Sequence, residues 1–349
     1  MMGVLNHLST LLLLSLLPPA LSHVVLKFSD VSDCETFFLD GTTPNLPGIF
    51  VGGMVHNQGQ NQNRYKLICQ KYNNIYRFAT LYDTTNRIPV FSAYTFSGKV
   101  VGRPKQSWMI EPQLENINDQ RDMKVDNKAV TNQAVDTDYK KNNLDLDRGH
   151  LFPCSYAPDD DAKRSTFTLT NAVPQKRSFN QRSWAKMECK VRKALEVHCK
   201  DNNNKIKAYV VTGAVPSSNK LNDRVNIPDL MWTAFCCFDN KLKDWVTQAH
   251  WGENQNEDKG KTLTPVTLGA LEDKLNQIYS VGVKVFDNKC LRDVVLKDET
   301  GRNLEAVEEV EPGKKRVREG SGEGNIKMAR ASGELKDCDD EDGCDCDCD

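Results

Sequence analysis

Residues 144–192 organise the rest of this chain. The stretch begins LDLDRGHL and closes with FNQRSWAKMECKVR. Between these blocks, residues 167–175 (FTLTNAVPQ) form an alternating, β-branched run, which predicts a strand that ends in a turn at Pro174. From Asn180 to about His198 there is no proline or glycine. The apolar residues there recur at intervals of three and four, which predicts an amphipathic helix.

One stripe of this expected helix carries polar side chains. Asn180, Trp184, Glu188 and Arg192 recur every fourth residue, so a helix places them on one face. A strand that ends near His150, a loop and this helix can bring His150, Asn180 and Glu188 within reach of one another.

This combination of residue types indicates a chemistry. A histidine deprotonates water near neutral pH. An asparagine oxygen and a carboxylate are hard ligands, which favour Mg²⁺, Mn²⁺ or Ca²⁺ over zinc. The guanidinium groups of Arg148 and Arg192 can neutralise phosphate oxygens through paired hydrogen bonds. Together these groups predict phosphodiester hydrolysis with one metal ion.

The same residues resemble the active-site block of the DNA/RNA non-specific endonucleases, the ββα-metal-finger family. The intervals from the histidine to the later polar residues match the family pattern without a gap, and the likeness covers roughly residues 30–290. Several motifs in order are far more specific than one tetrad. The residues that carry the resemblance are Asp147, Arg148, Gly149, His150, Thr170, Asn171, Pro174, Gln175, Asn180, Trp184, Glu188 and Arg192.

The resemblance implies a role for each site residue. His150 is the expected general base, Asn180 the direct metal ligand, and Glu188 the residue that holds metal-bound water. Asn171 and Arg192 are expected to support the site and the phosphate.

The substrate side of the site departs from the family pattern. Many members carry an essential arginine just before a tryptophan, whereas here Trp108 follows Gln106 and Ser107, and the nearest guanidinium is Arg103. Arg103 and Asp147 are assigned to substrate binding. If Arg103 cannot reach the phosphate, the enzyme is expected to be slow.

Each residue taken singly has a structural explanation. His150 fits a hydrogen-bonded structural histidine, and Asn180 fits a helix N-cap. Glu188 and Arg192 fit a solvated i, i+4 ion pair, and Trp184 fits the core under either interpretation. Their joint spacing requires several coincidences, so we favour the nuclease.

The first 22 residues predict a secretory signal peptide. Residues 11–17 are apolar apart from Ser15, and small residues follow at Ala20 and Ser22, which is typical of cleavage near Ser22. The apolar run is too short to span a bilayer comfortably, and no later segment reaches the length of a transmembrane helix. We therefore expect a secreted or lumenal protein with no transmembrane segment.

Composition divides the remainder into a body and a tail. Residues 23–296 are enough for one endonuclease domain, whereas residues 297–349 have the biased, charged and Asp/Cys-rich composition of a disordered tail. From Arg302 to Asp349 there are 8 Lys+Arg and 15 Asp+Glu, so this segment carries −7 and residues 1–301 carry +5. A mildly positive body suits a polyanionic substrate but does not alone indicate nucleic acid.

Cysteines support an oxidising compartment. Eight of the 12 lie in the body, and an even number behind a signal peptide predicts disulfides whose connectivity the sequence does not fix. The adjacent Cys236 and Cys237 are expected to have different partners. Cys154 and Cys189 lie close in sequence to two candidate site residues and are expected to brace the two arms of the site.

The hydrophobic pattern favours an α+β fold, because strands and helices mix without βαβ repetition. Residues 111–143 predict a polar surface loop with a short helix. The family resemblance implies a central antiparallel or mixed sheet with the ββα-metal finger on one face. Strands are predicted over 87–96, 206–215, 230–239 and 245–249, and a closing helix over 268–280.

These observations predict a secreted, metal-dependent endonuclease that cuts DNA and RNA through backbone contacts, without sequence preference. Mg²⁺ is the expected ion, with Mn²⁺ or Ca²⁺ as alternatives. A second class is a secreted nuclease-like protein that binds nucleic acid or a partner and cleaves poorly; the displaced Arg103 supports it and the intact His/Asn/Glu set opposes it. A third is a stable carrier for a reactive tail, which deletion after Leu296 would test. The oligomeric state stays open.

Overall fold

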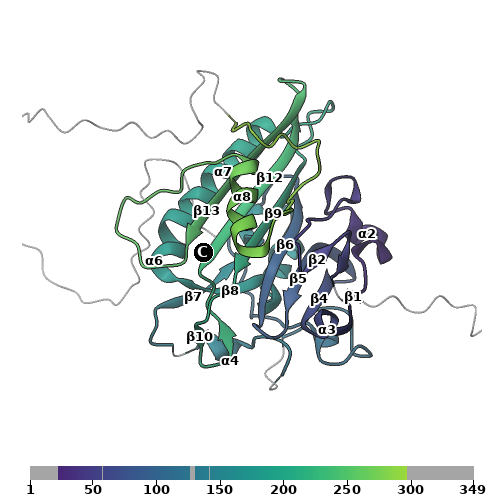
Figure 1. The fold of residues 1–349 in the computed structure, drawn as a ribbon, viewed down its shortest axis with the longest axis vertical. Coiled ribbons are helices and arrows are strands. Elements are labelled where there is room, and N and C mark those ends of the chain that lie inside the picture. Colours follow the sequence, from purple (N-terminus) through teal and green to yellow (C-terminus); the bar gives the residue numbers. More distant parts are fainter. Residues whose placement is uncertain (1–22, 57, 126–129, 141, 297–349) are drawn as a thin grey trace, which may run out of the picture.

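A seven-stranded antiparallel sheet forms the centre of the protein (Figure 1). The structure is a computed structural model that describes residues 23–56, 58–125, 130–140 and 142–296. Every pairing in the sheet is antiparallel, which confirms the predicted α+β class. In spatial order the strands are β1 (Val24–Val25), β4 (Tyr65–Tyr72), β5 (Ile75–Asp83), β6 (Ile88–Phe96), β9 (Ala208–Val215), β12 (Leu230–Asp239) and β13 (Asp244–Glu253).

Smaller elements surround this sheet. Two-stranded pairs are formed by β2 (Phe50–Val51) with β3 (Met54–Val55), β7 (Leu146–His150) with β8 (Ala172–Lys176), and β10 (Lys220–Leu221) with β11 (Val225–Asn226). The α-helices are α2 (Ser32–Glu35), α3 (Gln58–Arg64), α4 (Asp136–Tyr139), α5 (Asp160–Ser165), α6 (Arg177–Phe179), α7 (Ala185–His198) and α8 (Leu268–Tyr279). Short 3₁₀ turns are η1 (Phe28–Asp30), η2 (Leu39–Gly41), η3 (Pro112–Leu114), η4 (Cys154–Tyr156) and η5 (Leu169–Asn171), and η6 (Asn180–Trp184) is π-helical.

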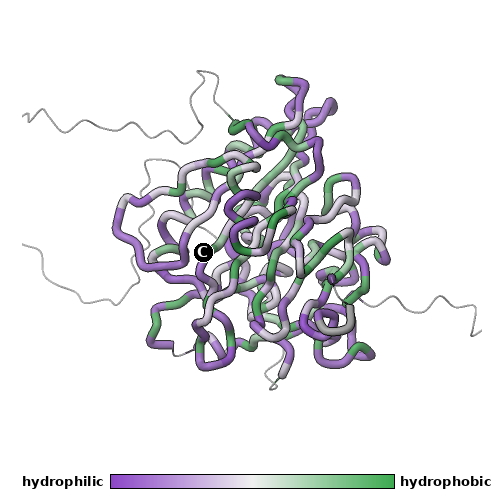
Figure 2. Tube along the Cα trace, viewed as in Figure 1, coloured by the Kyte–Doolittle hydropathy of each residue, from purple (hydrophilic) through white to green (hydrophobic). Residues whose placement is uncertain are grey.

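Both faces of the sheet are buried. Alternate residues of each strand point to opposite faces, so each strand contributes side chains to two cores. Val210 and Met231 pack in one core with α7, whereas their neighbours Val211 and Trp232 pack in a second core with α8. Figure 2 shows hydrophobic residues along the central strands and hydrophilic residues in the outer loops. The result is a sheet sandwiched between α7 with β7 and β8 on one side and α8 with the N-terminal segment on the other.

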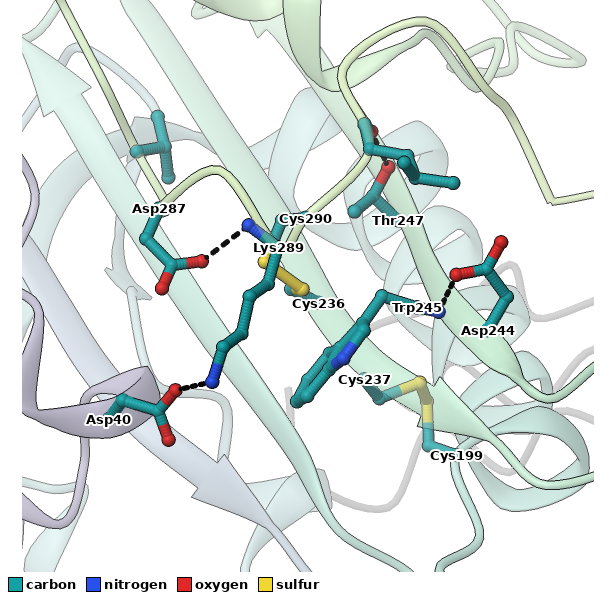
Figure 3. The surroundings of a disulfide bond; sticks show 12 residues. Asp40, Cys199, Cys236, Cys237, Asp244, Trp245, Thr247, Asp287, Lys289 and Cys290 are labelled. Atoms are coloured by element: carbon teal, nitrogen blue, oxygen red, sulfur yellow. Dashed lines mark hydrogen bonds and ion pairs between the residues drawn. A yellow bond between two sulfur atoms is a disulfide. The ribbon is translucent and has the colours of Figure 1, made fainter.

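The same alternation separates two adjacent cysteines. Cys237 bonds to Cys199 at the end of α7, and Cys236 bonds to Cys290 on the α8 side (Figure 3). The prediction of different partners is thus confirmed. A third disulfide joins Cys34 to Cys69.

Cys154 and Cys189 are also disulfide-bonded, and no described cysteine is free. That these two brace the arms of the candidate site stays a prediction, which substitution of either by serine would test through stability and activity.

The strands predicted over 87–96, 206–215, 230–239 and 245–249 and the closing helix are confirmed. The strand predicted over 167–175 begins only at Ala172, after the 3₁₀ turn η5, and two further local predictions are wrong. Pro174 does not end a strand in a turn; it lies inside β8, opposite Arg148, where a two-stranded ribbon leaves an outer edge that needs no N–H. Residues 111–143 are not a surface loop throughout, since Glu111, Gln133 and Ala134 are fully buried.

In the part of the chain that the structure describes, no helix is both long and apolar enough to cross a membrane. The predicted signal peptide (residues 1–22) and tail (residues 297–349) lie outside the described residues.

Candidate functional site

The polar stretch of the sequence folds into a hairpin followed by a helix. Strand β7 pairs with β8 so that His150 lies opposite Ala172 and Asp147 opposite Gln175. The chain then passes through α6 and η6 into α7, which packs against β12 of the central sheet (Figure 1). The π-helical turn begins at Asn180, and such turns are frequent at functional sites.

Gly149 is required by a close approach between the two strands. A Cβ atom at this position would lie 1.9 Å from Oε1 and 2.7 Å from Cβ of Gln175. Because no side chain fits there, the glycine of the tetrad allows the hairpin to close beside His150.

His150 lies at the end of β7 in an aromatic pocket. Its ring centroid is 5.0 Å from that of Trp108 and 4.9 Å from that of Phe167. The guanidinium of Arg103 lies 5.2 Å above the Phe167 ring. Burial, and second the positive charge of Arg103, lower the pKa of His150 from 6.5 to about 3, so its imidazole is neutral at physiological pH.

Asp147 links β7 to the start of the helix. Its carboxylate accepts hydrogen bonds from Arg177 Nε (3.2 Å), Gln181 Nε2 (2.9 Å) and Asn180 Nδ2 (3.4 Å). The side chain of Asn180 is therefore held by the strand. Asn180 has helical φ and ψ (−56° and −51°) between α6 and η6, whose N-cap is Phe179, so the N-cap explanation of Asn180 does not apply. The amide oxygen of Asn180 is the end turned away from Asp147.

Glu188 and Arg192 are buried, so they are not a solvated ion pair. Glu188 is 8% exposed and Arg192 5%. The indole N–H of Trp184 donates to Glu188 Oε1 (2.8 Å), and the Tyr156 hydroxyl donates to the Glu188 carbonyl (2.6 Å). These two bonds fix both the side chain and the backbone of Glu188.

Arg192 is an unusual buried cation. Its Nη2 donates to Cys189 Sγ at 3.9 Å, its Nε has no hydrogen-bond partner, and no ion pair links it to a carboxylate within the described residues. A buried guanidinium without a counter-charge is costly. An anion bound beside Arg192 would supply that counter-charge, which gives a physical reason for a buried arginine at this position.

Arg148 differs from Arg192 in its partners. Its Nη2 pairs with Asp136 at 2.6 Å, and its guanidinium lies over the rings of Trp108 (5.6 Å) and Tyr139 (5.2 Å). The charge of Arg148 is thus already neutralised, and its side chain lies against one wall of the His150 pocket.

Asn171 holds the backbone that follows His150. It is fully buried, its Oδ1 accepts from Phe152 N (2.9 Å), and its Nδ2 donates to the carbonyls of Phe152 and Thr166 (both 3.0 Å). These hydrogen bonds hold the segment that follows His150; that Asn171 supports the catalytic site stays a prediction.

The walls of the His150 pocket were not predicted from the sequence. Phe167, Asp136 and Tyr139 act through contacts across the fold, and their spacing in the sequence gives no signal for these contacts. Only Trp108 was noted, as a family landmark.

The donor set fits a hard cation rather than zinc. Among residues 23–296 as far as they are described, no group of three or more His, Cys, Asp or Glu side chains could hold a metal. One amide and one carboxylate suit an ion that keeps most of its water ligands. Hydrogen bonds from Asn180 to Asp147 and from Trp184 to Glu188 orient both donors, as the supports of metal ligands do.

Comparison with known proteins gives a consistent result. The family model described as DNA/RNA non-specific endonuclease matches residues 57–288. The Endonuclease domain-containing 1 protein of Homo sapiens is 33% identical over 213 residues, or 59% of this chain and 39% of that protein. The Mus musculus protein of the same name is 31% identical over 213 residues, or 59% of this chain and 38% of its own length. Segments 82–94, 111–114 and 232–237 of the sequence also resemble the Endonuclease domain-containing 1 protein.

The match spans about two fifths of the length of these relatives. A chain in the crystal structure of the EndoG/EndoGI complex has a TM-score of 0.44 and 17% identity, covering 59% of this chain and 84% of that one. The family model covers well over half of the sequence, and its match includes every candidate site residue. The chain therefore belongs to the DNA/RNA non-specific endonuclease family.

Proposed function

We propose that this protein is a secreted, metal-dependent endonuclease that hydrolyses phosphodiester bonds of DNA and RNA, with β7, β8 and α7 as its ββα-metal finger. The observation that carries the proposal is the joint placement of two groups. A neutral His150 lies near Arg103, and Asp147, on the same strand as His150, holds the helix residue Asn180.

His150 acts as the general base. It is 9% exposed while its Nε2 is buried without a hydrogen-bond partner, so Nδ1 is the nitrogen that a water can reach. With the ring proton on Nε2, Nδ1 takes the proton of the attacking water. Trp108 and Phe167 hold the ring in place and exclude bulk water from its buried edge.

Asn180 and Glu188 would hold Mg²⁺, with Mn²⁺ or Ca²⁺ as alternatives. When bound, the ion stabilises negative charge on the leaving 3′-oxygen. The chain supplies the orientation, because Asp147 fixes the amide of Asn180 and Trp184 fixes the carboxylate of Glu188.

Arg192 and Arg103 bind the phosphate. Arg192 has unused hydrogen-bonding capacity, and Arg103 is exposed on the His150 side. Guanidinium groups suit two-point contact with phosphate oxygens. Arg148, already paired with Asp136, instead supports Trp108. Backbone contacts of this kind give affinity that falls as salt rises and little base preference.

Secretion is supported by the disulfides, because all described cysteines are oxidised and such bonds persist outside the cytosol. Residues 1–22 are proposed as the signal that directs the chain there.

The test is degradation of plasmid DNA and of RNA by the oxidised, full-length protein with Mg²⁺, Mn²⁺ or EDTA, beside His150→Ala and Asn180→Ala. We expect cutting that needs the metal and is lost in both variants. A correctly folded wild type that binds nucleic acid without cutting it would refute the nuclease and favour the binding protein.

A second experiment tests Asn180 as a metal ligand by removing the Asp147 carboxylate that orients it. Asp147→Ala should raise the metal concentration for half-maximal activity by about 10- to 100-fold, with most activity restored at saturating metal. Asp145→Asn is the matched control, since Asp145 also pairs with Arg177 (3.3 Å) but is exposed. Equal effects of the two substitutions would contradict the assignment.

A further inference from the structure

A continuous row of buried polar side chains runs from the N-terminal edge of the sheet to the candidate site. Each member is fully buried, although isolated polar groups are costly in a protein interior. The row begins beside β1, crosses β4, β5 and β6, and reaches the turn that precedes β8. Its members are His23, Glu111, Thr168, Thr170, Gln70, Thr80, Ser92 and Asn171.

Glu111 sets the direction of the first half of the row. Its Oε1 accepts from the hydroxyl of Thr168 (3.0 Å), which lies 3.1 Å from the hydroxyl of Thr170. Thr168 donates to this oxygen, and the Thr170 hydroxyl lies within reach of both the Thr168 hydroxyl and Glu111 Oε1 (3.5 Å), so in either case it donates toward the carboxylate. Thr170 in turn accepts from Gln70 Nε2 (2.8 Å). Each hydroxyl orientation therefore follows from the carboxylate.

The second half continues from the same amide group. Gln70 Nε2 also donates to the Thr80 hydroxyl (3.1 Å), which lies 3.0 Å from Ser92 Oγ. Ser92 donates to Asn171 Oδ1 (3.0 Å). Every contact is consistent with one sequence of donors and acceptors, which is how buried networks specify a single arrangement.

The far end of the row fixes the backbone after His150. Asn171 Oδ1 accepts from Phe152 N, and the Asn171 carbonyl accepts from Leu151 N (both 2.9 Å). Leu151 and Phe152 directly follow His150, so the orientation of Asn171 determines where the chain leaves β7. A reversed amide at Asn171 would place its NH₂ group against the Phe152 N–H.

His23 completes the near end. Its Nε2 lies 3.0 Å from Glu111 Oε2, with both side chains fully buried, although the angle is not that of a hydrogen bond. Its backbone N donates to Gln113 Oε1 and its carbonyl accepts from Cys69 N. The edge strand thus anchors the imidazole beside the carboxylate.

We propose that Glu111 and Thr168, with His23 beside them, are positioning residues for His150. The buried carboxylate fixes the direction of the hydrogen-bond row, and the row fixes Asn171 and the segment 151–152 that holds the base in place. This inference rests on the proposed role of His150 as the general base.

Thr168→Val removes the hydroxyl with little change in shape. Thr247→Val is the matched control, because Thr247 is equally buried and its hydroxyl donates to Leu291 O (2.7 Å) on the other side of the sheet. Amide hydrogen exchange at Phe152 and the values of kcat and KM for a small chromogenic phosphodiester are measured in both variants, with Mg²⁺ present.

We expect Thr168→Val to speed exchange at Phe152 and to lower kcat, each by about tenfold relative to Thr247→Val, with KM unchanged, because small misplacements of a catalytic group are costly. Glu111→Gln keeps the shape but can donate as well as accept, so its effect should be smaller than that of Glu111→Ala.

Equal exchange at Phe152 in the two threonine variants would overturn the proposal, and so would faster exchange with an unchanged kcat. The exchange measurement does not depend on cleavage. A wild type that cuts no phosphodiester would overturn the proposed function, and Phe152 exchange would still decide whether the row holds this segment.

Discussion

The sharpest prediction concerns the pH dependence of cleavage and its control by Arg103. The pKa of His150 is lowered from 6.5 to about 3, first by burial and second by the charge of Arg103. A general base works only when it is neutral, so the acidic limb of kcat/KM should lie far below the value for an exposed histidine.

The expected size follows from these two values. At pH 5 an imidazole with a pKa of 6.5 is about 3% neutral, whereas one with a pKa of about 3 is about 99% neutral, a difference of about 30-fold in rate. Arg103→Ala removes the second cause and leaves the first. The acidic limb should therefore move toward 6.5 without reaching it, while Arg103→Lys should keep it in place.

The assay is kcat/KM for a small phosphodiester from pH 3.5 to 8 at saturating metal, for wild type and both Arg103 variants. The rate that remains in His150→Ala at each pH is subtracted, which removes titration of other groups. A wild-type acidic limb at or above pH 6.5 would refute the reasoning, and so would a limb that moves to lower pH in Arg103→Ala.

Three predictions concern stability. Burial lowers the pKa of His250 from 6.5 to about 3, so between these pH values the unfolded chain binds a proton that the folded protein does not. The free energy of unfolding should therefore fall by up to about 1.4 kcal/mol per pH unit below 6.5. Urea titrations at pH 7 and pH 4 should show that His250→Gln reduces this slope. Gly149→Ala should cost about 1–3 kcal/mol from overpacking against Gln175, partly recovered by Gln175→Ala; an unchanged urea midpoint would contradict the close approach. Loss of the Cys236–Cys290 bond, whose cysteines have a sequence separation of 54, should cost about 4 kcal/mol by denaturant unfolding of the double serine variant.

Regular elements could be predicted because their pattern is local. Residues 230–239 and the helix from Leu268 follow the hydrophobic periodicity of a buried strand and of an amphipathic helix. The hairpin of β4 and β5 was missed although its signal is present. Asn73 and Asn74 form its two-residue turn with φ of 50° and 61°, the left-handed conformation that asparagine tolerates.

Buried polar residues could not be predicted from pattern. Glu111 lies in a charged stretch that resembles a surface loop, and it is buried because His23, 88 positions earlier in the sequence, lies against it. The stripe that contains Asn180 and Glu188 was predicted because helical spacing is local. The contacts made across the fold were not predicted: Asp147 accepts from the Asn180 side chain, and the Tyr156 hydroxyl donates to the backbone carbonyl of Glu188.

The sequence predicts that Arg148 and Arg192 both neutralise phosphate oxygens, but their surroundings in the fold differ. The Arg148 side chain is 22% exposed and paired with Asp136 at 2.6 Å, so a phosphate would have to displace a carboxylate that already satisfies it. Arg192 is 5% exposed, with only a sulfur contact, so a phosphate would relieve the cost of its burial. Loss of Arg192 should therefore remove charge stabilisation at the phosphate, whereas loss of Arg148 should act through Trp108 and the His150 pocket. We therefore predict that Arg103 and Arg192, and not the arginine of the tetrad, make the direct contacts with the phosphate.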